Sequence, residues 1–245
     1  MEEIISLIKE ELALKAQPEK ITILQRFFKT GPGEYAEGDD FLGIVVPDQR
    51  LIAKKFASKL KPEEMLSLLK SQYHEHRLTA LLIWTYQYPK ASENEKEKIA
   101  KLYLQSTNYI NNWDLVDLSA YKILGTYLES KPRQLLYDLA DSNNLWEQRI
   151  AIITTLHFIR KNDFTDTLKL SEILLNHQHD LIQKAVGWML REVGKRNLET
   201  EINFLNQHYQ NMPRTMLRYA IEKFDEKLRQ SFLKNKHNII MQLIA

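Results

Sequence analysis

The stretch YHEHRLTALLIW at residues 73–84 places apolar side chains three and four residues apart, at Leu78, Leu81 and Leu82. Side chains at this spacing share one face of an α-helix, which indicates an amphipathic helix. Similar spacing continues along most of the chain, whereas strand-like alternation is nearly absent. The one run with β-character, GIVVP at residues 43–47, ends in a proline that suits the first turn of a helix. The sequence therefore predicts an all-α fold.

The predicted helix at residues 73–84 belongs to a weak internal repeat, because it can be laid over LWEQRIAIITTL at residues 145–156. One position recurs at steps of 36, 36, 35 and 34 residues, at Arg77, Trp113, Arg149, Lys184 and Arg218. This period is typical of solenoids built from helix pairs. We expect the partner helices of the outer layer at residues 92–106, 131–141, 165–176 and 197–211. The sequence thus predicts an α-solenoid, a superhelix of antiparallel helix pairs.

The repeat also predicts what the inner, concave layer presents. Residues one period apart lie side by side on adjacent parallel helices, so the five repeated positions form a row. Asp117 lies one helical turn from Trp113, and Trp188 lies one turn from Lys184. The predicted surface is a concave basic groove with two tryptophans and one carboxylate, which suits the phosphates and sugars of a nucleic acid.

The composition narrows the class of protein. Of the 245 residues, 44% are hydrophobic and 27% are charged, as in globular domains. The absence of cysteine excludes disulfides, thiol nucleophiles and cysteine-ligated zinc or iron–sulfur clusters. The N-terminal segment is acidic and amphipathic, and no apolar run approaches the length of a membrane span. We expect a monomeric cytoplasmic protein that does not insert into membranes.

The net charge of +2 is distributed unevenly along the chain. Residues 1–49 hold 5 basic and 10 acidic residues, whereas residues 50–245 hold 29 basic and 22 acidic ones. We expect a single domain over residues 1–245, with acidic N-terminal helices and a glycine-rich loop before the repeats that line the groove. The basic segment at residues 214–236 either contacts a polyanion or caps the last repeat.

A glycine-rich stretch and two histidine pairs are further candidates for binding sites. GPGEYAEGDDFLG at residues 31–43 holds four of the seven glycines, but it lacks the lysine and spacing of a phosphate-binding loop. We expect it to be a connector that touches a partner. The pairs His74/His76 and His177/His179 lack a third ligand, and residues two apart on a helix diverge. The sequence therefore predicts no metal site.

Four stretches resemble the bacterial DNA alkylation repair glycosylases of the AlkD type, namely FFKTGPGEYAEGDDFLGIVVPDQR at 27–50, NNWDLVDLSA at 111–120, LWEQRIAI at 145–152 and QKAVGWMLREVGK at 183–195. The resemblance implies HEAT-like repeats whose positively charged concave face holds duplex DNA. It implies hydrolysis of the N-glycosidic bond of purines alkylated at ring nitrogen 3 or 7, without a metal or organic cofactor. The expected compartment is the bacterial cytoplasm or nucleoid.

The resemblance also assigns roles to individual residues. The family's catalytic aspartate falls on Asp117, its companion tryptophan on Trp113 and its active-site arginine on Arg149. Its second tryptophan falls on Trp188, and an aromatic residue that is often tyrosine in relatives falls on Phe27, so a phenol hydroxyl is absent here. Further contacts to DNA are expected from basic side chains of the groove, at Lys184, Arg191, Arg218 and Arg77.

Structural roles compete with several of these assignments. A tryptophan on a helical face normally packs in the core, as we expect for Trp84 and Trp146. Asp117 could instead be an ordinary solvated residue of its helix. Arg149 could instead form an ion pair with a carboxylate in an adjacent repeat. Asp114 points about 100° away from Trp113 on the same helix, so we expect it to support a neighbouring repeat.

The alternative to a glycosylase is a catalytically inactive helical-repeat module. Such a module would bind nucleic acid or protein through the same groove, as solenoids commonly do. A scaffold that binds only protein would show little salt dependence in its affinity for DNA, whereas a groove that neutralises phosphates would show a steep one.

Overall fold

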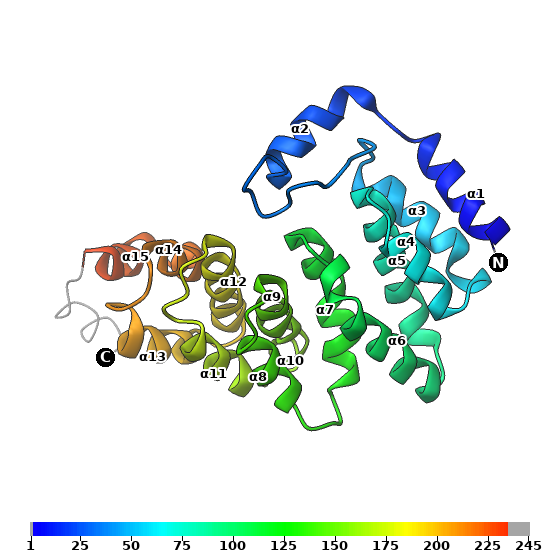
Figure 1. Ribbon diagram of the computed structural model, residues 1–245. Coiled ribbons are helices and arrows are strands. Elements are labelled where there is room, and N and C mark those ends of the chain that lie inside the picture. The colour runs from blue at the N-terminus through cyan, green and yellow to red at the C-terminus, as the bar shows by residue number, and fades with distance from the viewer. Residues whose placement is uncertain (1, 235–245) are drawn as a thin grey trace. The chain divides into compact units, whose positions relative to one another are not determined.

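The computed structural model describes residues 2–234 and divides into two compact units, the first ending at Lys131 and the second beginning at Pro132 (Figure 1). The prediction of an all-α fold is confirmed, because the described residues form helices and one isolated bridge, between Asp40 and Tyr73, but no strand. The expected single domain stays a prediction. Lys236 of the basic segment lies outside the described residues.

The described part of unit 1 contains α1 (Glu2–Ala13), α2 (Pro18–Phe28), α3 (Val46–Phe56), α4 (Leu66–Leu69), α5 (His74–Gln87), α6 (Glu93–Gln105) and α7 (Trp113–Tyr127). Short 3₁₀ turns join several of them, namely η1 (Ala57–Lys59), η2 (Pro62–Met65), η3 (Tyr88–Lys90) and η4 (Thr107–Tyr109). The glycine-rich stretch at residues 31–43 connects α2 to α3 as predicted.

The described part of unit 2 contains α8 (Gln134–Ala140), α9 (Leu145–Thr154), α10 (Leu156–Ile159), α11 (Thr165–Ile173), α12 (Asp180–Arg196), α13 (Leu198–His208), α14 (Arg214–Ala220), η5 (Ile221–Lys223) and α15 (Glu226–Leu233). None of the described helices in either unit combines the length and apolar character that a membrane crossing requires.

The helices form two rows within each unit. In unit 1, α5 packs between α3 and α7, and α6 packs on α7. In unit 2, α12 packs between α9 and α14, while α8, α11 and α13 form the second row (Figure 1). Each of the four partner helices expected from the repeat is present, as α6, α8, α11 and α13. The helix-pair architecture is thus confirmed within each unit, whereas the concave basic groove stays a prediction.

The apolar positions that predicted the helices form the cores of the units. Leu78, Leu81 and Leu82 are at most 1% exposed, and α5 is buried along most of its length because other helices cover it on several sides. Trp84 and Trp146 are buried, which confirms their prediction as core residues. Full burial of each such side chain stabilises the folded protein by about 1.5–3 kcal/mol.

Local sequence decides where the helices begin. The side-chain oxygen of Asn112 accepts a hydrogen bond from the backbone N–H of Trp113 at 2.8 Å, and Asn144 accepts one from Trp146 at 2.9 Å. Each asparagine thereby satisfies a backbone donor that has no partner within its helix. Pro47 lies in the first turn of α3, as its sequence context predicted. The cap at Asn112 sets the start of α7 and with it the positions of Trp113 and Asp117.

Candidate functional site

Trp113 and Asp117 occupy successive turns at the start of α7, and both are half-buried. Burial raises the pKa of the nearby Tyr103 phenol, and the negative charge of Asp117 raises it further, while the hydrogen bond between Tyr103 and Ser119 opposes the shift. The Tyr103 hydroxyl lies 2.9 Å from the Ser119 hydroxyl oxygen. The half-buried Asp117 therefore lies near the buried Tyr103 phenol.

Two aromatic rings of α2, those of Phe27 and Phe28, contact the Trp113 indole. Phe28 stacks on it at 5.3 Å between ring centroids, with 19° between the planes. Phe27 meets it edge to face at 5.6 Å and 79°, and 59% of Phe27 is exposed. Such pairs are worth about 0.5–1.5 kcal/mol beyond the area that they bury. The structure thus brings Phe27 of α2 against Trp113 of α7, while the roles predicted for both residues stay predictions.

The ring stack continues below Phe28. Phe41, from the glycine-rich loop, stacks on Phe28 at 5.2 Å and 19°, and His74 lies against Phe28 at 4.8 Å. Phe41 and His74 also stack on each other, at 4.7 Å and 18°. Phe28, Phe41 and His74 thus form a compact cluster of three rings from α2, the loop and α5, and the Trp113 indole stacks on its Phe28 member.

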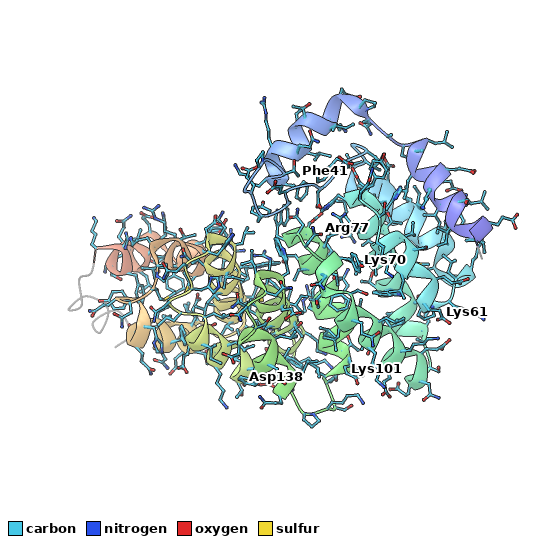
Figure 2. The ribbon with its side chains drawn as sticks, viewed as in Figure 1. Phe41, Lys61, Lys70, Arg77, Lys101 and Asp138 are labelled. Atoms are coloured by element: carbon cyan, nitrogen blue, oxygen red, sulfur yellow. The ribbon has the colours of Figure 1, made fainter. Side chains whose placement is uncertain are left out.

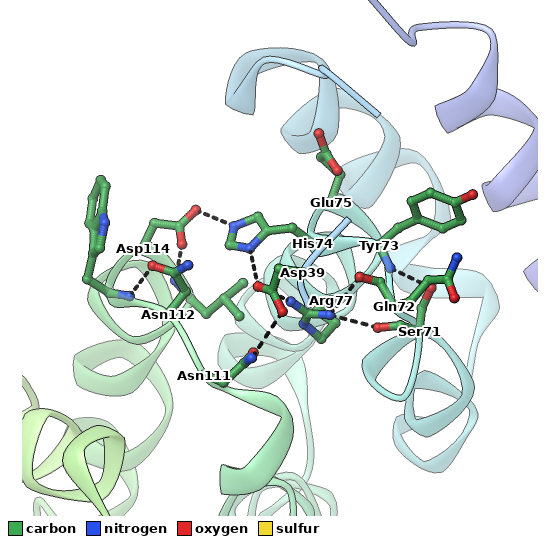
Figure 3. A network of polar contacts seen from close by, with 12 residues as sticks. Asp39, Ser71, Gln72, Tyr73, His74, Glu75, Arg77, Asn111, Asn112 and Asp114 are labelled. Carbon is green, nitrogen blue, oxygen red and sulfur yellow. Dashed lines mark hydrogen bonds and ion pairs between the residues drawn. The ribbon is translucent and has the colours of Figure 1, made fainter. Parts of the chain in front are cut away.

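His74 also belongs to a network of four buried charged side chains, with Asp39, Arg77 and Asp114 (Figure 3). The carboxylate of Asp114 lies 2.9 Å from Nε2 of His74, and that of Asp39 lies 3.5 Å from Nδ1. Arg77 forms an ion pair with Asp39 at 2.5 Å. Asn111 donates to the other Asp39 oxygen at 3.1 Å. The prediction that Asp114 supports a neighbouring repeat is confirmed, because its partner His74 belongs to α5.

The carboxylates keep His74 protonated. Burial alone lowers the pKa of the imidazole, but the charge of Asp114 and the hydrogen bonds to Asp114 and Asp39 outweigh that effect and raise it to about 9. Two carboxylates then face two cations, His74 and Arg77. The charges of these four side chains therefore balance, which is how buried charges are tolerated.

Arg77 lies inside unit 1, which corrects the assignment of this residue as a contact to DNA. It is 4% exposed, and besides Asp39 it binds the carbonyl oxygens of Ser71 and Gln72, at 2.8 and 3.1 Å. Arg77 and Phe41 lie where the glycine-rich loop meets α5 (Figure 2). Arg77 lies on α5, the helix that the repeat predicted for it. Its guanidinium turns inward because it forms an ion pair with the buried Asp39.

The glycine-rich loop is fixed to the start of α5. The buried Glu75 carboxylate accepts hydrogen bonds from the backbone N–H groups of Leu42, Gly43 and Ile44, at 3.0, 2.9 and 3.1 Å. Gly43 has a φ of 83°, and a Cβ there would lie 2.1 Å from the carbonyl oxygen of Gln17. Only glycine fits this close approach. The loop therefore has a defined path that brings Asp39 and Phe41 to His74.

In unit 2, Arg149 of α9 is 5% exposed, and its Nη1 donates to the carbonyl oxygen of Leu181 at 2.5 Å. It thus connects α9 to the first turn of α12. Trp188 on α12 is half-buried, and its indole N–H donates to Glu192 at 3.0 Å. The roles predicted for both residues in binding DNA stay predictions.

The remaining predicted cations of unit 2 lie at its surface. Lys184 forms an ion pair with Asp180 at 2.6 Å, and Arg191 pairs with Glu222. Arg218 is exposed on α14. Exposed ion pairs contribute only about 0–1 kcal/mol, so a phosphate group can replace their carboxylates at little cost. Of these three side chains, Arg218 and Lys184 are more accessible than Arg191, whose side chain is 16% exposed, and contacts of all three with DNA stay predictions.

The paired histidines have partners within the protein. Nδ1 of His76 lies 2.8 Å from the Ser71 hydroxyl, and Nε2 of His177 lies 2.9 Å from the side-chain oxygen of Gln148. His179 accepts a hydrogen bond from the backbone N–H of Leu181. Among residues 2–234, no group of three or more histidine, aspartate or glutamate side chains has a geometry that could hold a metal ion.

Sequence reasoning missed Phe28, Phe41 and the partnership of His74 with Asp39. In the sequence, His74 is noticeable only as one member of the pair His74/His76, which is a pattern to check for metal binding. The spacing of the two histidines does not indicate that His74 contacts two carboxylates. The contacts from His74 to Asp39 and to Asp114 join residues 35 and 40 positions apart. A helical period of 3.6 residues carries no information about contacts at that separation.

Comparisons with known proteins bear on the family and the fold of the chain. A family model described as DNA alkylation repair enzyme matches residues 8–224. Among solved structures, the chain is similar to one described as a predicted DNA alkylation repair enzyme from Enterococcus faecalis, with a TM-score of 0.66 and 17% sequence identity over 86% of this chain and 98% of that one. At this identity the likeness supports the helical fold alone. No curated protein matches the chain.

Proposed function

Because its residues 8–224 match the family model, the chain belongs to the family of DNA alkylation repair enzymes, and we propose that it is a monofunctional DNA glycosylase. Membership of the family gives the protein a role in DNA repair, with DNA as its partner. Its proposed substrate is a purine alkylated at ring nitrogen 3 or 7 in duplex DNA. The proposed reaction is hydrolysis of the bond between that base and its deoxyribose.

The proposed chemistry needs one carboxylate. An alkylated purine of this kind carries a positive charge, so it leaves without strong help from a general acid. As the N-glycosidic bond lengthens, the deoxyribose takes on the character of an oxocarbenium cation. We assign its stabilisation to Asp117, which also positions the attacking water molecule. A hydrolase acting on a neutral sugar leaving group would need a second carboxyl group to protonate it.

The observation that carries this proposal is the pairing of Asp117 with Trp113 on successive turns of α7. An indole face attracts cations, and such an interaction contributes about 0.5–2 kcal/mol. Trp113 therefore favours both the charged base and the charged sugar in the transition state. Its support by Phe28 holds the indole in place before the substrate arrives, so less ordering is needed on binding.

Residues of unit 2 are assigned to binding. Lys184, Arg191 and Arg218 would contact phosphates of the DNA backbone, which supplies affinity without sequence preference. Trp188 would favour the cationic lesion as Trp113 does. Arg149 is 5% exposed and its Nη1 is bound to the carbonyl oxygen of Leu181, so the phosphate contact that the resemblance implies requires its other N–H groups to become accessible when DNA binds.

The first experiment follows release of 7-methylguanine from duplex DNA by the wild type and by Asp117→Asn. The exchange removes the charge but keeps the shape of the side chain. We expect release by the wild type and a loss of about 100-fold or more in the variant, the usual size of an effect of this class. Binding of DNA by both proteins should remain strong and should weaken with salt.

Asp138→Asn is the matched control, because it removes an exposed carboxylate on α8 that binds Gln134 at 3.0 Å (Figure 2). Its rate should equal that of the wild type. If both the wild type and Asp117→Asn bind DNA but neither the 7-methylguanine substrate nor a 3-methyladenine control loses its base, the protein is a catalytically inactive DNA-binding module. Loss of salt-dependent binding altogether would point to a protein scaffold.

A further inference from the structure

Building on the proposed glycosylase, we propose that His74 is a positioning residue: held between Asp39 and Asp114, its imidazolium fixes the Trp113 indole and the first turn of α7, which carries Asp117. His74 belongs to α5 and is almost entirely buried, so it acts through its neighbours and without touching DNA. Two separate chains of contacts lead from it to Trp113.

The first chain of contacts runs through Asp114, the residue that follows Trp113. One Asp114 oxygen lies 2.9 Å from Nε2 of His74, and the other accepts the backbone N–H of Leu115 at 2.9 Å. The carboxylate thus ties the first turn of α7 to the first residue of α5. Because α7 is a continuous helix to Tyr127, the direction of its first turn also sets where Asp117 lies.

The second chain of contacts runs through the aromatic rings. The imidazole stacks on Phe41 and lies against Phe28, and Phe28 stacks on the Trp113 indole. A shift of the imidazole would remove the support below Phe28. The indole would then be free to tilt. Both chains of contacts begin at one side chain, so removal of that side chain affects the backbone and the indole together.

The charges around His74 make its position depend on its proton. The groups that face it are Asp39 from the loop, Asp114 from α7 and Arg77 from its own helix. With His74 protonated, Asp39 and Asp114 balance His74 and Arg77 in a region closed to water, while the buried carboxylate of Glu75 is satisfied by three backbone N–H groups. Without that proton, one buried carboxylate has no balancing charge, and the contacts of both carboxylates with the imidazole weaken.

The direction of the pH effect follows from the pKa. The pKa of His74 rises from 6.5 to about 9 in the folded protein. The stabilisation that this shift supplies is complete below pH 6.5 and is lost as the pH rises through about 9. The rate of base release should therefore have an alkaline limb near pH 9 that belongs to His74.

The main test compares His74→Gln with His76→Gln. His76 is the matched control, because it is a histidine two positions along α5 that pairs with Ser71 and has a pKa lowered to about 4 by burial. We expect His74→Gln to lower the single-turnover rate on a 7-methylguanine duplex by about 10-fold or more while the DNA concentration at half-saturation changes less than about 2-fold. His76→Gln should change neither quantity.

A merely structural role for His74 predicts a different outcome. In that case, the His74→Gln substitution would lower the melting temperature, but the folded fraction of the variant would release the base at the wild-type rate. A variant with native circular dichroism and the wild-type rate therefore overturns the proposal. The same conclusion follows if the rate of the wild type shows no alkaline limb that His74→Gln removes.

Asp114→Asn provides a second variant in case His74→Gln fails to fold. It keeps the shape of the side chain and an oxygen that can accept from His74, but it removes one charge. The pKa of His74 should fall by about one unit or more, and the alkaline limb should move to lower pH with it. If NMR showed that the His74 imidazole of the wild type titrates below pH 7, the proposed positioning role would be contradicted.

NMR also separates failure of this proposal from failure of the proposed function. If the wild type releases no base, the glycosylase proposal fails, but the Trp113 indole signal can still be compared between the wild type and His74→Gln. That signal is identified by its loss in Trp113→Phe. An indole signal unchanged in His74→Gln overturns the positioning role whether or not the protein is an enzyme.

Discussion

His74 and Glu201 are both buried and both have a raised pKa, but for opposite reasons. Carboxylates beside His74 favour its charged form. Glu201 on α13 is 1% exposed, and burial disfavours its charged form and raises its pKa to about 9, although the charge of Arg191 opposes the shift. One of its oxygens has no hydrogen-bond partner among the described residues. His74 therefore stabilises the fold as a cation, whereas Glu201 remains uncharged at neutral pH.

Replacement of Glu201 by glutamine should stabilise the protein above pH 5. The ordinary pKa of the carboxyl is 4.5, so the unfolded chain ionises above that pH while the folded protein keeps the proton. The wild type therefore loses stability as the pH rises from 4.5 towards 9. We expect Glu201→Gln to gain about 1–3 kcal/mol at pH 8 and little at pH 4.5, measured by denaturant unfolding.

Glu199→Gln serves as the control for this prediction, since Glu199 is exposed on the same helix. It makes the same change of residue type at an exposed position, where no burial is relieved, and should leave stability nearly unchanged. A difference between Glu201→Gln and the wild type that stayed constant from pH 4.5 to pH 8 would show that Glu201 ionises in the folded protein.

At the scale of elements, close packing of α12 on α14 depends on Gly187. A Cβ at this position would lie 2.4 Å from the carbonyl oxygen of Met216 and 2.6 Å from Cβ of Tyr219. Atoms this close must move, and a backbone carbonyl within a helix cannot move alone. Gly187 belongs to the same segment of α12 as Trp188, so the position of that tryptophan depends on the same contact.

Gly187→Ala is expected to destabilise the protein. Alanine favours a helix over glycine by about 1 kcal/mol, but overpacking against a fixed backbone costs about 1–3 kcal/mol or more. We expect the clash to dominate and the melting temperature to fall by several degrees. Gly31→Ala is the comparison, because its Cβ would meet only the flexible Glu34 side chain, at 3.0 Å. Equal melting temperatures for the two variants would argue against a rigid contact between α12 and α14.

At the scale of the whole molecule, the positive charge lies downstream of residue 49. Binding of DNA through phosphates releases counterions, so the logarithm of the affinity falls linearly with that of the salt concentration. The slope counts the phosphates contacted, at about 0.9 for each. A comparison of slopes therefore identifies which cations contact DNA without the need for a structure of the complex.

The combined exchange of Lys184, Arg191 and Arg218 for glutamine should reduce the salt slope by about 3, if each contacts one phosphate. The control exchanges three lysines of α6 that also pair with carboxylates, Lys96, Lys98 and Lys101. It makes the same change in net charge and should leave the slope nearly unchanged. Equal reductions in both variants would show that the total charge of the protein, and not these three residues, sets the affinity.

The amino-acid sequence by itself determined the helical class, the two-row pairing of helices and the approximate bounds of the partner helices. These features depend on apolar spacing over a few residues and on a period near 35 residues, and both patterns are visible directly in the sequence. The resemblance added candidate roles for Asp117 and Trp113. The membership of the family followed from the match over residues 8–224.

Only the tertiary structure decided which side chains meet. Arg77 occupies the expected helix yet turns inward, because the path of the loop carries Asp39 to it. His74 joins Asp39 to Asp114 across 35 and 40 positions of sequence. Burial gives each of these contacts its strength, because charges attract more strongly where water is excluded. Local spacing can predict a helix face, but which groups are buried together depends on the packing of distant segments.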